Sequence, residues 1–597
     1  MLKTFSIILF LSIQIYRAQA TLEILPQDSL TYNLQSKSPG WISIKSKDAN
    51  LAISLFCEGK KVKDQDNSKG TQSVENLFYN PEKNKKYTLK IWAKSYLEKS
   101  KKAKIEISEL KKRIILDDKL SYDEMVQDIK YFRTIREQVN SGLYVYRNKK
   151  EIDSIYNWAI QKAEISETIF DFYKIIAALT QFEGSCHNFT DLPNHATYYL
   201  TQKNEYLPFT FKNVEGYLLQ NSKGISIPLS AEIISINGIL SSDIIKRFSQ
   251  YYSSDGLTLN YKETAGFEKG MFDKFYIEFG THKNYKIIYK WNNKEYKVVL
   301  PGISFEEFKN LQESRHSLSS DSSKQTGAYS LNKENNDTYR LILKTFDFAN
   351  SKDDIAYKKF STFLDNMLLT LEKERTNNLI IDLRGNGGGA GALYEKVFTY
   401  FTQRPFRDSQ FAYTNFNQIP FKDKLVITPM FLANGVKNGH DVDLYLKQIY
   451  PTSSQGKFYW ADEKNPLILP NEKVFNGQIY LFIDENVASA GSHLASLFKS
   501  YTNAVVIGKE TNGGYYEHNG HLPVVYELPN TKIQTGFSVV HVIQDVQNLN
   551  DQKKGSGVVP HIKVNQTPKE FLEQTDVYMT KVFELQQKKI HLNKNLF

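Results

Sequence analysis

Two short segments of the 597-residue chain carry residues that could perform acyl-transfer chemistry. The first, residues 378–389, is an apolar run that ends in Arg-Gly-Asn-Gly-Gly-Gly, and the second, residues 477–491, places Ser489 between small residues. Each segment predicts a strand that runs into a special turn, and a helix is expected to begin at Ala490. Hydrolases with a serine nucleophile are often built in this way, with the serine at a helix N-terminus beside bare backbone N–H groups. The two segments therefore favour a serine peptidase with Ser489 as the nucleophile.

The backbone around this serine is expected to supply an oxyanion hole. The N–H of Ala490 would lack an intrahelical partner, because the first N–H groups of a helix have none. An N–H of Gly388 or Gly389 is the expected second donor, and Arg384 and Asp382 could hold the glycine turn by hydrogen bonds. Two other interpretations stay open at this point: a serine that only caps a helix, and a phosphate-binding loop, although the Gly-Lys-Ser/Thr ending is missing.

The composition is that of an ordinary soluble protein. Hydrophobic residues make up 41% and charged residues 24% of the chain, and the net charge of +10 shows no dense Lys/Arg block, so we expect no nucleic-acid partner. His518 and His521 lie in a segment predicted to be a loop, and there is no His-Glu-x-x-His motif or cysteine cluster. We therefore expect neither a metal nor a cofactor.

The N-terminus has the pattern of a secretory signal peptide. Lys3 precedes an apolar run over residues 5–15, and Ala18-Gln19-Ala20 is a small-x-small cleavage site. The apolar run is too short to span a bilayer, and no later stretch predicts a transmembrane helix. We expect cleavage after Ala20 and a periplasmic or secreted product. Such a compartment permits a disulfide, but whether Cys57 and Cys186 pair is left open.

Hydrophobic periodicity divides the remaining chain. Alternating runs predict an all-β sandwich over residues 21–112, and a helical segment over 113–200 begins with the capping box of Ser121 and Glu124. Strands return over 205–305, and a polar stretch over 310–337 is typical of a linker or surface loop. From residue 338 to 597 strands and helices alternate, which predicts an α/β core with a largely parallel sheet covered by helices.

Several motifs in a fixed order resemble the C-terminal processing (tail-specific) serine peptidases, in the branch related to the tricorn core and to secreted bacterial members. They are Asp382-Leu-Arg-Gly-Asn-Gly-Gly, Asp484-Glu-Asn-Val-Ala-Ser-Ala-Gly, Val505-Val-Ile-Gly-Lys-Glu-Thr-Asn-Gly-Gly and Gly557-Val-Val-Pro. The resemblance covers about residues 121–575. It implies a ClpP/crotonase-like peptidase core, Ser489 as nucleophile and the N–H groups of Ala490 and Gly388 as the oxyanion hole. It also implies a PDZ-like module within 205–305 that binds peptide ends.

Members of that family differ in their general base. The position of the lysine used by one branch corresponds to Gly514, with Lys509 nearby but out of place. The histidine used by the other branch corresponds to His187 in Gly184-Ser-Cys-His-Asn, so the resemblance favours a Ser489–His187 pair, with a histidine that titrates near neutral pH. An acid expected just before Gly557 is missing. Glu517 is the first candidate for the acid that orients the histidine; the others are residues Glu510 and Asp545.

The whole pattern predicts an endopeptidase that cleaves extended peptides or unfolded protein tails without a cofactor. The alternative is a non-catalytic peptide- or ligand-binding protein on the same fold. A weaker hypothesis is that the N-terminal sandwich attaches the chain to glycan or to a cell surface. The sequence does not determine the oligomeric state.

Overall fold

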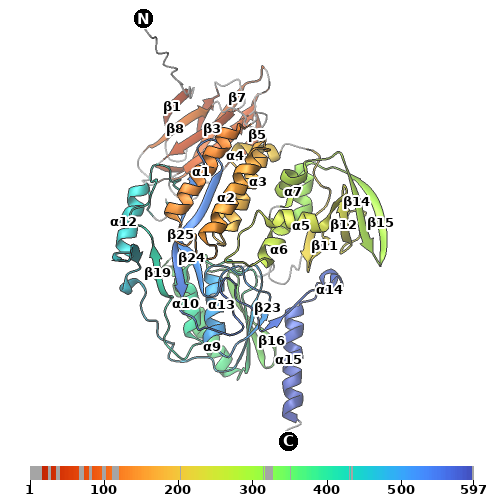
Figure 1. The fold of residues 1–597 in the computed structure, drawn as a ribbon, viewed down its shortest axis with the longest axis vertical. Coiled ribbons are helices and arrows are strands. Elements are labelled where there is room, and N and C mark those ends of the chain that lie inside the picture. The colour runs from red at the N-terminus through yellow and green to blue at the C-terminus, as the bar shows by residue number, and fades with distance from the viewer. Residues whose placement is uncertain are drawn as a thin grey trace. The chain divides into compact units, whose positions relative to one another are not determined.

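The computed structural model describes the chain from Tyr16 to Lys594. Residues 25–28, 35–39, 47, 66–72, 80–81, 83, 97–101, 111–119, 202–203, 270, 314, 316–326, 350, 429–430 and 432–434 lie outside the described part. The chain divides into two compact units (Figure 1). One comprises residues 1–119, 194–199 and 427–436, and the other comprises 120–193, 200–426 and 437–597. Every residue of the predicted site belongs to the second unit.

The first unit contains two four-stranded antiparallel sheets. One has the order β1 (Tyr16–Ile24), β8 (Ala103–Leu110), β3 (Gly40–Ser46), β6 (Ser73–Tyr79). The other has the order β2 (Ser29–Asn33), β7 (Tyr87–Tyr96), β4 (Ala49–Cys57), β5 (Lys60–Gln65). Alternate residues of β3, β4 and β7 enter one shared core, among them Ile42, Ile44, Leu51, Ile53, Leu89 and Ile91, as the period-two pattern of these segments predicts. β1 includes the last residues of the predicted leader, of which residues 1–15 lie outside the described part.

Three helices open the second unit: α1 (Tyr122–Val139), α2 (Lys149–Ala163) and α3 (Ile169–Phe182). Each begins with a complete capping box, and the predicted one of Ser121 and Glu124 is confirmed. After α3, a short strand β9 (Phe189–Asp191) pairs with β25 (Gln534–Gln544), and α4 (Asn194–Leu200) follows. The residues between α3 and β9 are therefore fixed at both ends.

The segment predicted to be PDZ-like forms an antiparallel sheet with helices. The main order is β10 (Phe211–Val214), β11 (Tyr217–Gln220), β12 (Glu232–Ile236), β14 (Asn284–Trp291), β15 (Lys294–Pro301), and β13 (Ile239–Leu240) pairs with β12. The predicted Asn237–Gly238 turn joins β12 to β13, with φ of 50° and 83°. α5 (Ser241–Ser249), α6 (Asn260–Lys269), α7 (Met271–Phe279) and α8 (Phe305–Glu313) complete the segment. The sequence did not indicate α6 and α7.

A six-stranded sheet forms the centre of the second unit. Its order is β16 (Tyr329–Asn335), β17 (Thr338–Leu343), β18 (Asn378–Asp382), β22 (Gln478–Ile483), β23 (Val505–Gly508), β26 (Ile562–Lys563). All neighbours except β16 and β17 are parallel. β16 lies inside residues 310–337, so the prediction of a linker or loop was wrong for this part, where polar residues form a half-buried edge strand.

Both faces of this sheet are covered, which explains its uninterrupted apolar strands. Leu379, Ile381, Ile479 and Leu481 face one core, which they share with α9 (Ile355–Lys373), α10 (Gly391–Thr399) and α13 (Ala490–Tyr501). Ile380, Tyr480 and Phe482 face the opposite core, shared with α15 (Val577–Lys594). α14 (Pro568–Glu573) precedes α15. The mixed α/β core is therefore as predicted.

A second, antiparallel sheet in the core was not predicted. Its order is β20 (Thr452–Ser454), β21 (Lys457–Tyr459), β19 (Ser409–Thr414), β25, β24 (Glu517–Glu527), with α12 (Gly439–Ile449) and the 3₁₀ turn η1 (Asp462–Lys464) nearby in sequence. β24 contains His518 and His521, so the loop expected for these two histidines is a strand. No helix in the described part of the chain is both long and apolar enough to span a bilayer.

Candidate active site

The central sheet brings the two special turns together. β18 and β22 are parallel neighbours, with Asn378 opposite Gln478 and Asp382 opposite Phe482. Their carboxyl ends therefore lie at the same edge, which is where open α/β sheets form their sites. The Ala488 N–H donates a hydrogen bond of 3.1 Å to the Asn386 carbonyl, so the glycine turn and the serine turn are in direct contact.

Ser489 has the backbone of a strained nucleophile turn. Its φ of 52° and ψ of −127° are unusual for a residue other than glycine, and such a conformation costs about 1–3 kcal/mol. It stands at the N-cap position of α13, but its hydroxyl makes no capping hydrogen bond. Instead, Oγ lies 3.1 Å from Nε2 of His187, which is 302 residues away in the sequence. A pure helix-capping role for Ser489 does not fit this geometry.

His187 is held between the end of α3 and the start of β9. Gly184, with φ of 76°, turns the chain after α3, and the pairing of Phe189 with Gly536 fixes the other side. Below the turn, the buried Glu183 accepts a hydrogen bond of 2.7 Å from the Asn188 amide and lies 3.2 Å from the Arg136 guanidinium. The loop that carries the histidine is thus anchored by buried polar contacts.

The surroundings of His187 keep its imidazole neutral. Burial lowers the pKa of His187 below its ordinary value of 6.5, and the charge of Asp255 opposes that change. His521 lowers this pKa further, and a hydrogen bond to the backbone at Asn519 raises it. A neutral imidazole beside a serine hydroxyl can accept its proton, so the pair has the geometry and the protonation state of a nucleophile with its general base.

Backbone N–H groups near Ser489 are available for an oxyanion. Within the described part of the chain, no hydrogen bond uses the N–H of Ala490 or of Gly389. Gly388 is close, since a Cβ added there would lie 2.7 Å from the Ser489 Cβ and 2.9 Å from the Ala490 nitrogen. Its N–H, however, donates to Asn386 Oδ1 at 2.9 Å. The expected Gly388 donor is therefore already engaged, whereas the N–H groups of Gly387 and Gly389 donate no hydrogen bond within the described part of the chain.

Arg384 holds the glycine turn through hydrogen bonds to two carboxylates. Its guanidinium donates to both carboxylate oxygens of Asp382, at 2.9 and 2.6 Å, and to both of Asp576, at 3.0 and 3.1 Å. Bidentate pairs of this kind fix geometry as well as charge. Gly385 is also held, because its N–H donates to the Asp484 carboxylate at 3.0 Å. The structure thus places Arg384 as a residue that secures the loop.

The acids expected to orient His187 lie elsewhere. The Glu517 carboxylate is 3.3 Å from Nε2 of His541, on the row of β24 side chains opposite to His518. Glu510 accepts from the Gly557 N–H at 2.9 Å, and Asp545 accepts from the Arg407 N–H at 3.0 Å. The structure therefore does not bring Glu517 to His187, because successive side chains of a strand point to opposite faces.

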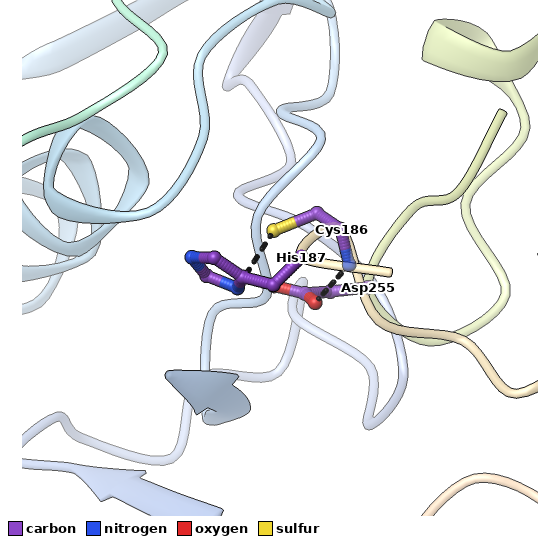
Figure 2. Close-up of side chains that lie close together, drawn as sticks. All are labelled: Cys186, His187 and Asp255. Atoms are coloured by element: carbon purple, nitrogen blue, oxygen red, sulfur yellow. Dashed lines mark hydrogen bonds between the residues drawn. The ribbon is translucent and has the colours of Figure 1, made fainter. Parts of the chain in front are cut away.

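Asp255 is the acid beside His187, and the sequence did not indicate it. Figure 2 shows Cys186, His187 and Asp255 gathered together, and their three ligand-type atoms lie within 4.8 Å of one another. The Asp255 carboxylate is buried and accepts hydrogen bonds of 2.8 Å from the N–H groups of Cys186 and Gly514. It sits in a turn between α5 and α6 without any periodic pattern, so only the tertiary structure could identify it.

Cys186 lies between the acid and the base. Its Sγ is 3.5 Å from Nδ1 of His187, one of the contacts drawn in Figure 2. Burial raises the pKa of the Cys186 thiol well above its ordinary value, and the charge and hydrogen bond of Asp255 add to that effect. The thiol is therefore protonated at neutral pH. Cys57 and Cys186 are both free thiols.

The structure also locates two alternatives considered from the sequence, Lys509 as the general base and a metal site. Lys509 pairs with Glu215 at 2.8 Å and with Glu485 at 3.8 Å. Burial lowers its pKa, but these two carboxylates outweigh burial and raise it, which is unsuited to a general base. Among the described residues, the one group of three that could hold a metal ion is Cys186, His187 and Asp255.

Comparison with protein families gives a match in the core of the second unit. Residues 343–564, which include both special turns, match the model of peptidase family S41. This part of the chain belongs to peptidase family S41, the C-terminal processing family, and the protein is a serine peptidase. A comparison with curated proteins returns no match.

Solved structures resemble a larger part of the chain. A serine-to-alanine mutant of CPAF is 14% identical, with a TM-score of 0.52, and the match covers 78% of this chain and 96% of that one. Mature CPAF complexed with lactacystin is 15% identical, with a TM-score of 0.48 and coverage of 79% and 99%. The photosystem II D1 C-terminal processing protease is 12% identical, with a TM-score of 0.31 and coverage of 75% and 94%. At such identity the likeness to the CPAF mutant shows a shared fold.

Proposed function

We propose that the protein is an endopeptidase that cleaves extended peptides or unfolded protein tails, with Ser489 as nucleophile and His187 as general base. The observation that carries the proposal is the 3.1 Å contact between Ser489 Oγ and His187 Nε2 at the start of a buried helix. The two residues come from distant segments, and a strained backbone holds the serine toward the base. Strain of this kind persists where the surrounding structure enforces it.

The proposed reaction follows from these contacts. Ser489 Oγ attacks the scissile carbonyl while Nε2 of His187 takes the hydroxyl proton. The N–H groups of Ala490 and Gly389 stabilise the tetrahedral oxyanion, and the imidazolium then returns its proton to the leaving amine. Water releases the acyl-enzyme by the same steps.

The proposed substrate class rests on the segment from 205 to 305. We infer that it acts as a PDZ-like module, because its sheet ends in the edge strands β10 and β15, to which an extended peptide could add. A cavity of about 580 Å³ lies beside β15, with the apolar residues Pro208, Ile225, Leu300, Ile303 and Leu311 in its lining. An apolar pocket next to a sheet edge suits a peptide end with an apolar side chain.

The test is labelling with a serine-reactive fluorophosphonate, followed by digestion of an unfolded protein such as fluorescein-labelled casein. Wild type is expected to label and to digest casein, whereas Ser489→Ala and His187→Ala lose both properties while their thermal unfolding midpoints stay close to that of wild type. Labelling that persists in Ser489→Ala would refute the assignment of the nucleophile. Folded wild type that binds peptides and releases them intact would instead support the alternative of a binding protein.

A further inference from the structure

We propose that a cavity on the other face of β24 from the active site is a second ligand site, which takes a small organic anion with an aromatic or apolar body. The anion is a carboxylate, either of a free acid or of the last residue of a peptide. The cavity has a volume of about 490 Å³, which lies in the range of small-molecule sites. All of its lining belongs to the second unit, and none of it takes part in the proposed catalytic step.

The floor of the cavity is one face of the antiparallel sheet. β19, β25 and β24 are neighbours in this sheet (Figure 1). Tyr413 lies opposite His541, and both Phe411 and Glu517 lie opposite Ile543. Residues opposite one another on paired strands share a face of the sheet, and these five side chains line the cavity together. The floor therefore combines aromatic and apolar side chains with one ionisable pair.

Loops from three other parts of the chain form the remaining walls. They contribute Tyr146, which lies between α1 and α2, Leu257, which precedes α6, and the stretch Lys554–Gly555. The Tyr146 hydroxyl donates a hydrogen bond of 2.8 Å to the Glu517 carbonyl. The Leu257 N–H donates one of 2.8 Å to the Gly555 carbonyl. The walls are thus fixed to the floor and to each other before a ligand binds.

β24 separates this cavity from the catalytic pair. Glu517 lines the cavity, whereas the ring of the next residue, His518, lies 6.3 Å from the ring of His187. Successive side chains of a strand point to opposite faces of the sheet. Neither Ser489 nor His187 is part of the lining. The cavity is therefore distinct from the active site.

The charge of Glu517 is compensated within the cavity by His541. The Gly142 N–H donates to Asn140 Oδ1 at 3.0 Å, so the Asn519 amide nitrogen is the group that donates to the same oxygen, also at 3.0 Å. Asn519 Oδ1 then accepts from Nδ1 of His541 at 3.1 Å, while Nε2 lies 3.3 Å from the Glu517 carboxylate. Only the imidazolium donates from both nitrogens. The pair therefore adds no net charge to the lining.

Two lysines give the cavity its positive charge. Nζ of Lys457 lies 3.8 Å from the centre of the Tyr413 ring, a cation–π contact that holds the ammonium group against the aromatic floor. Lys554 is exposed at the rim. Within the described residues, neither ammonium group has a carboxylate partner. A carboxylate between the two lysines would pair with both, and its apolar body would cover the Phe411 ring, of which 43% of the residue is exposed.

The cavity beside β15 differs from this one in charge. Among the described residues, its lining contains no lysine or arginine, and its one ionisable side chain is that of Glu307. A carboxylate beside another carboxylate is disfavoured. A neutral apolar side chain therefore suits the cavity beside β15, whereas a free carboxylate suits the cavity at β24.

Titration calorimetry at neutral pH tests the site, with N-acetyl-phenylalanine as the probe and its amide as the uncharged analogue. Wild type should bind the acid about tenfold more tightly than the amide, because a charge-assisted hydrogen bond contributes that much. Ser489→Ala and His187→Ala should bind the acid as wild type does. Equal affinities for the acid and the amide, or no binding of the acid, would overturn the site.

Lysine variants locate the anion. Lys457→Gln should weaken binding of the acid by about tenfold, and Lys457→Arg should retain it, because a guanidinium keeps the charge and stacks on an aromatic ring. Lys554→Gln, at the exposed rim where the fold does not depend on it, should weaken binding by about threefold. Lys297→Gln on the exposed face of β15 is the matched control and should bind as wild type does. Unchanged affinity in both cavity variants would refute the assignment.

A tetrapeptide distinguishes the two sources of the carboxylate. Acetyl-Ala-Ala-Ala-Phe with a free carboxylate is titrated into Ser489→Ala, so that it is not cleaved. Tighter binding than that of N-acetyl-phenylalanine assigns the site to peptide ends, and equal binding assigns it to free acids; both results support an anion site. Wild type that binds the acid but does not react with fluorophosphonate would keep this site and remove the proposed function, so the two failures are distinguishable.

Discussion

The residues around the proposed nucleophile are small because the two turns are in contact. Gly388 has φ of 105°, and a Cβ there would lie 2.7 Å from the Ser489 Cβ. Gly389 has φ of 138°, and a Cβ there would lie 2.0 Å from the Phe346 carbonyl. Gly387 differs from both, because its surroundings are open. Three successive glycines therefore do not have one common role.

This difference predicts opposite outcomes for two alanine variants. Gly388→Ala should slow fluorophosphonate labelling by about 100-fold, the size of the loss when an oxyanion donor is displaced, and should lower the thermal midpoint. Gly387→Ala is the matched control and should change the free energy of unfolding by no more than about 0.5 kcal/mol. Equal labelling rates in the two variants would contradict the close approach of the turns.

The protonation of His187 predicts the pH dependence of the reaction. The base must be neutral, and burial lowers its pKa below the ordinary value of 6.5. The imidazole of His187 therefore stays neutral down to a lower pH than the imidazole of an exposed histidine does. The labelling rate should reach half of its plateau below pH 6.5. A midpoint above pH 7 in the wild-type curve would show that another group, or a more exposed histidine, controls the reaction.

At the scale of elements, the site depends on how strand ends are secured. Arg384 follows β18 and connects it to Asp576, the residue before α15, while it also clamps Asp382. About a quarter of its side chain is exposed, at 24%, compared with 6% for Asp382. The pair is thus largely removed from water, and the loss of one partner would leave a carboxylate with incomplete compensation.

Arg384→Gln should therefore destabilise the second unit by about 3 kcal/mol, the lower end of the cost of breaking a buried pair. The measurement is the thermal unfolding midpoint by calorimetry. Lys373→Gln, at the exposed end of α9, is the matched control and should shift the midpoint little. An unchanged midpoint in Arg384→Gln would mean that Arg340, at 3.8 Å from Asp382, is sufficient to compensate that carboxylate.

Elements with a local pattern could be predicted from the sequence, and those without one could not. α13 begins at Ala490 and ends at Tyr501, as its small-residue turn and apolar spacing predict. β25 was not predicted because nearly all of its residues are buried, so its sequence shows no period-two alternation. The same limit applies to the site. The small residues around Ser489 indicate its role in the sequence, whereas Asp255 lies beside His187 only in the folded chain.

At the scale of the whole molecule, the N-terminus carries a prediction of its own. We expect cleavage after Ala20, which would shorten β1 to residues 21–24. Expression in a bacterial host with its signal intact, followed by intact-mass measurement of the exported protein, should give a chain that begins at Thr21. A mass that includes residues 1–20 would contradict the leader and leave the full β1 paired with β8.

The distance in sequence between Ser489 and His187 determines when the site can form during synthesis and folding. The serine turn, the glycine turn, the histidine loop and the Asp255 turn come from four separate stretches, and the serine stretch is the last to be synthesised. A nascent chain therefore contains His187 and Asp255 before it contains Ser489, and a misfolded chain can hold the nucleophile apart from its base. On the proposed mechanism, completion of the fold is itself the event that joins the nucleophile to its base.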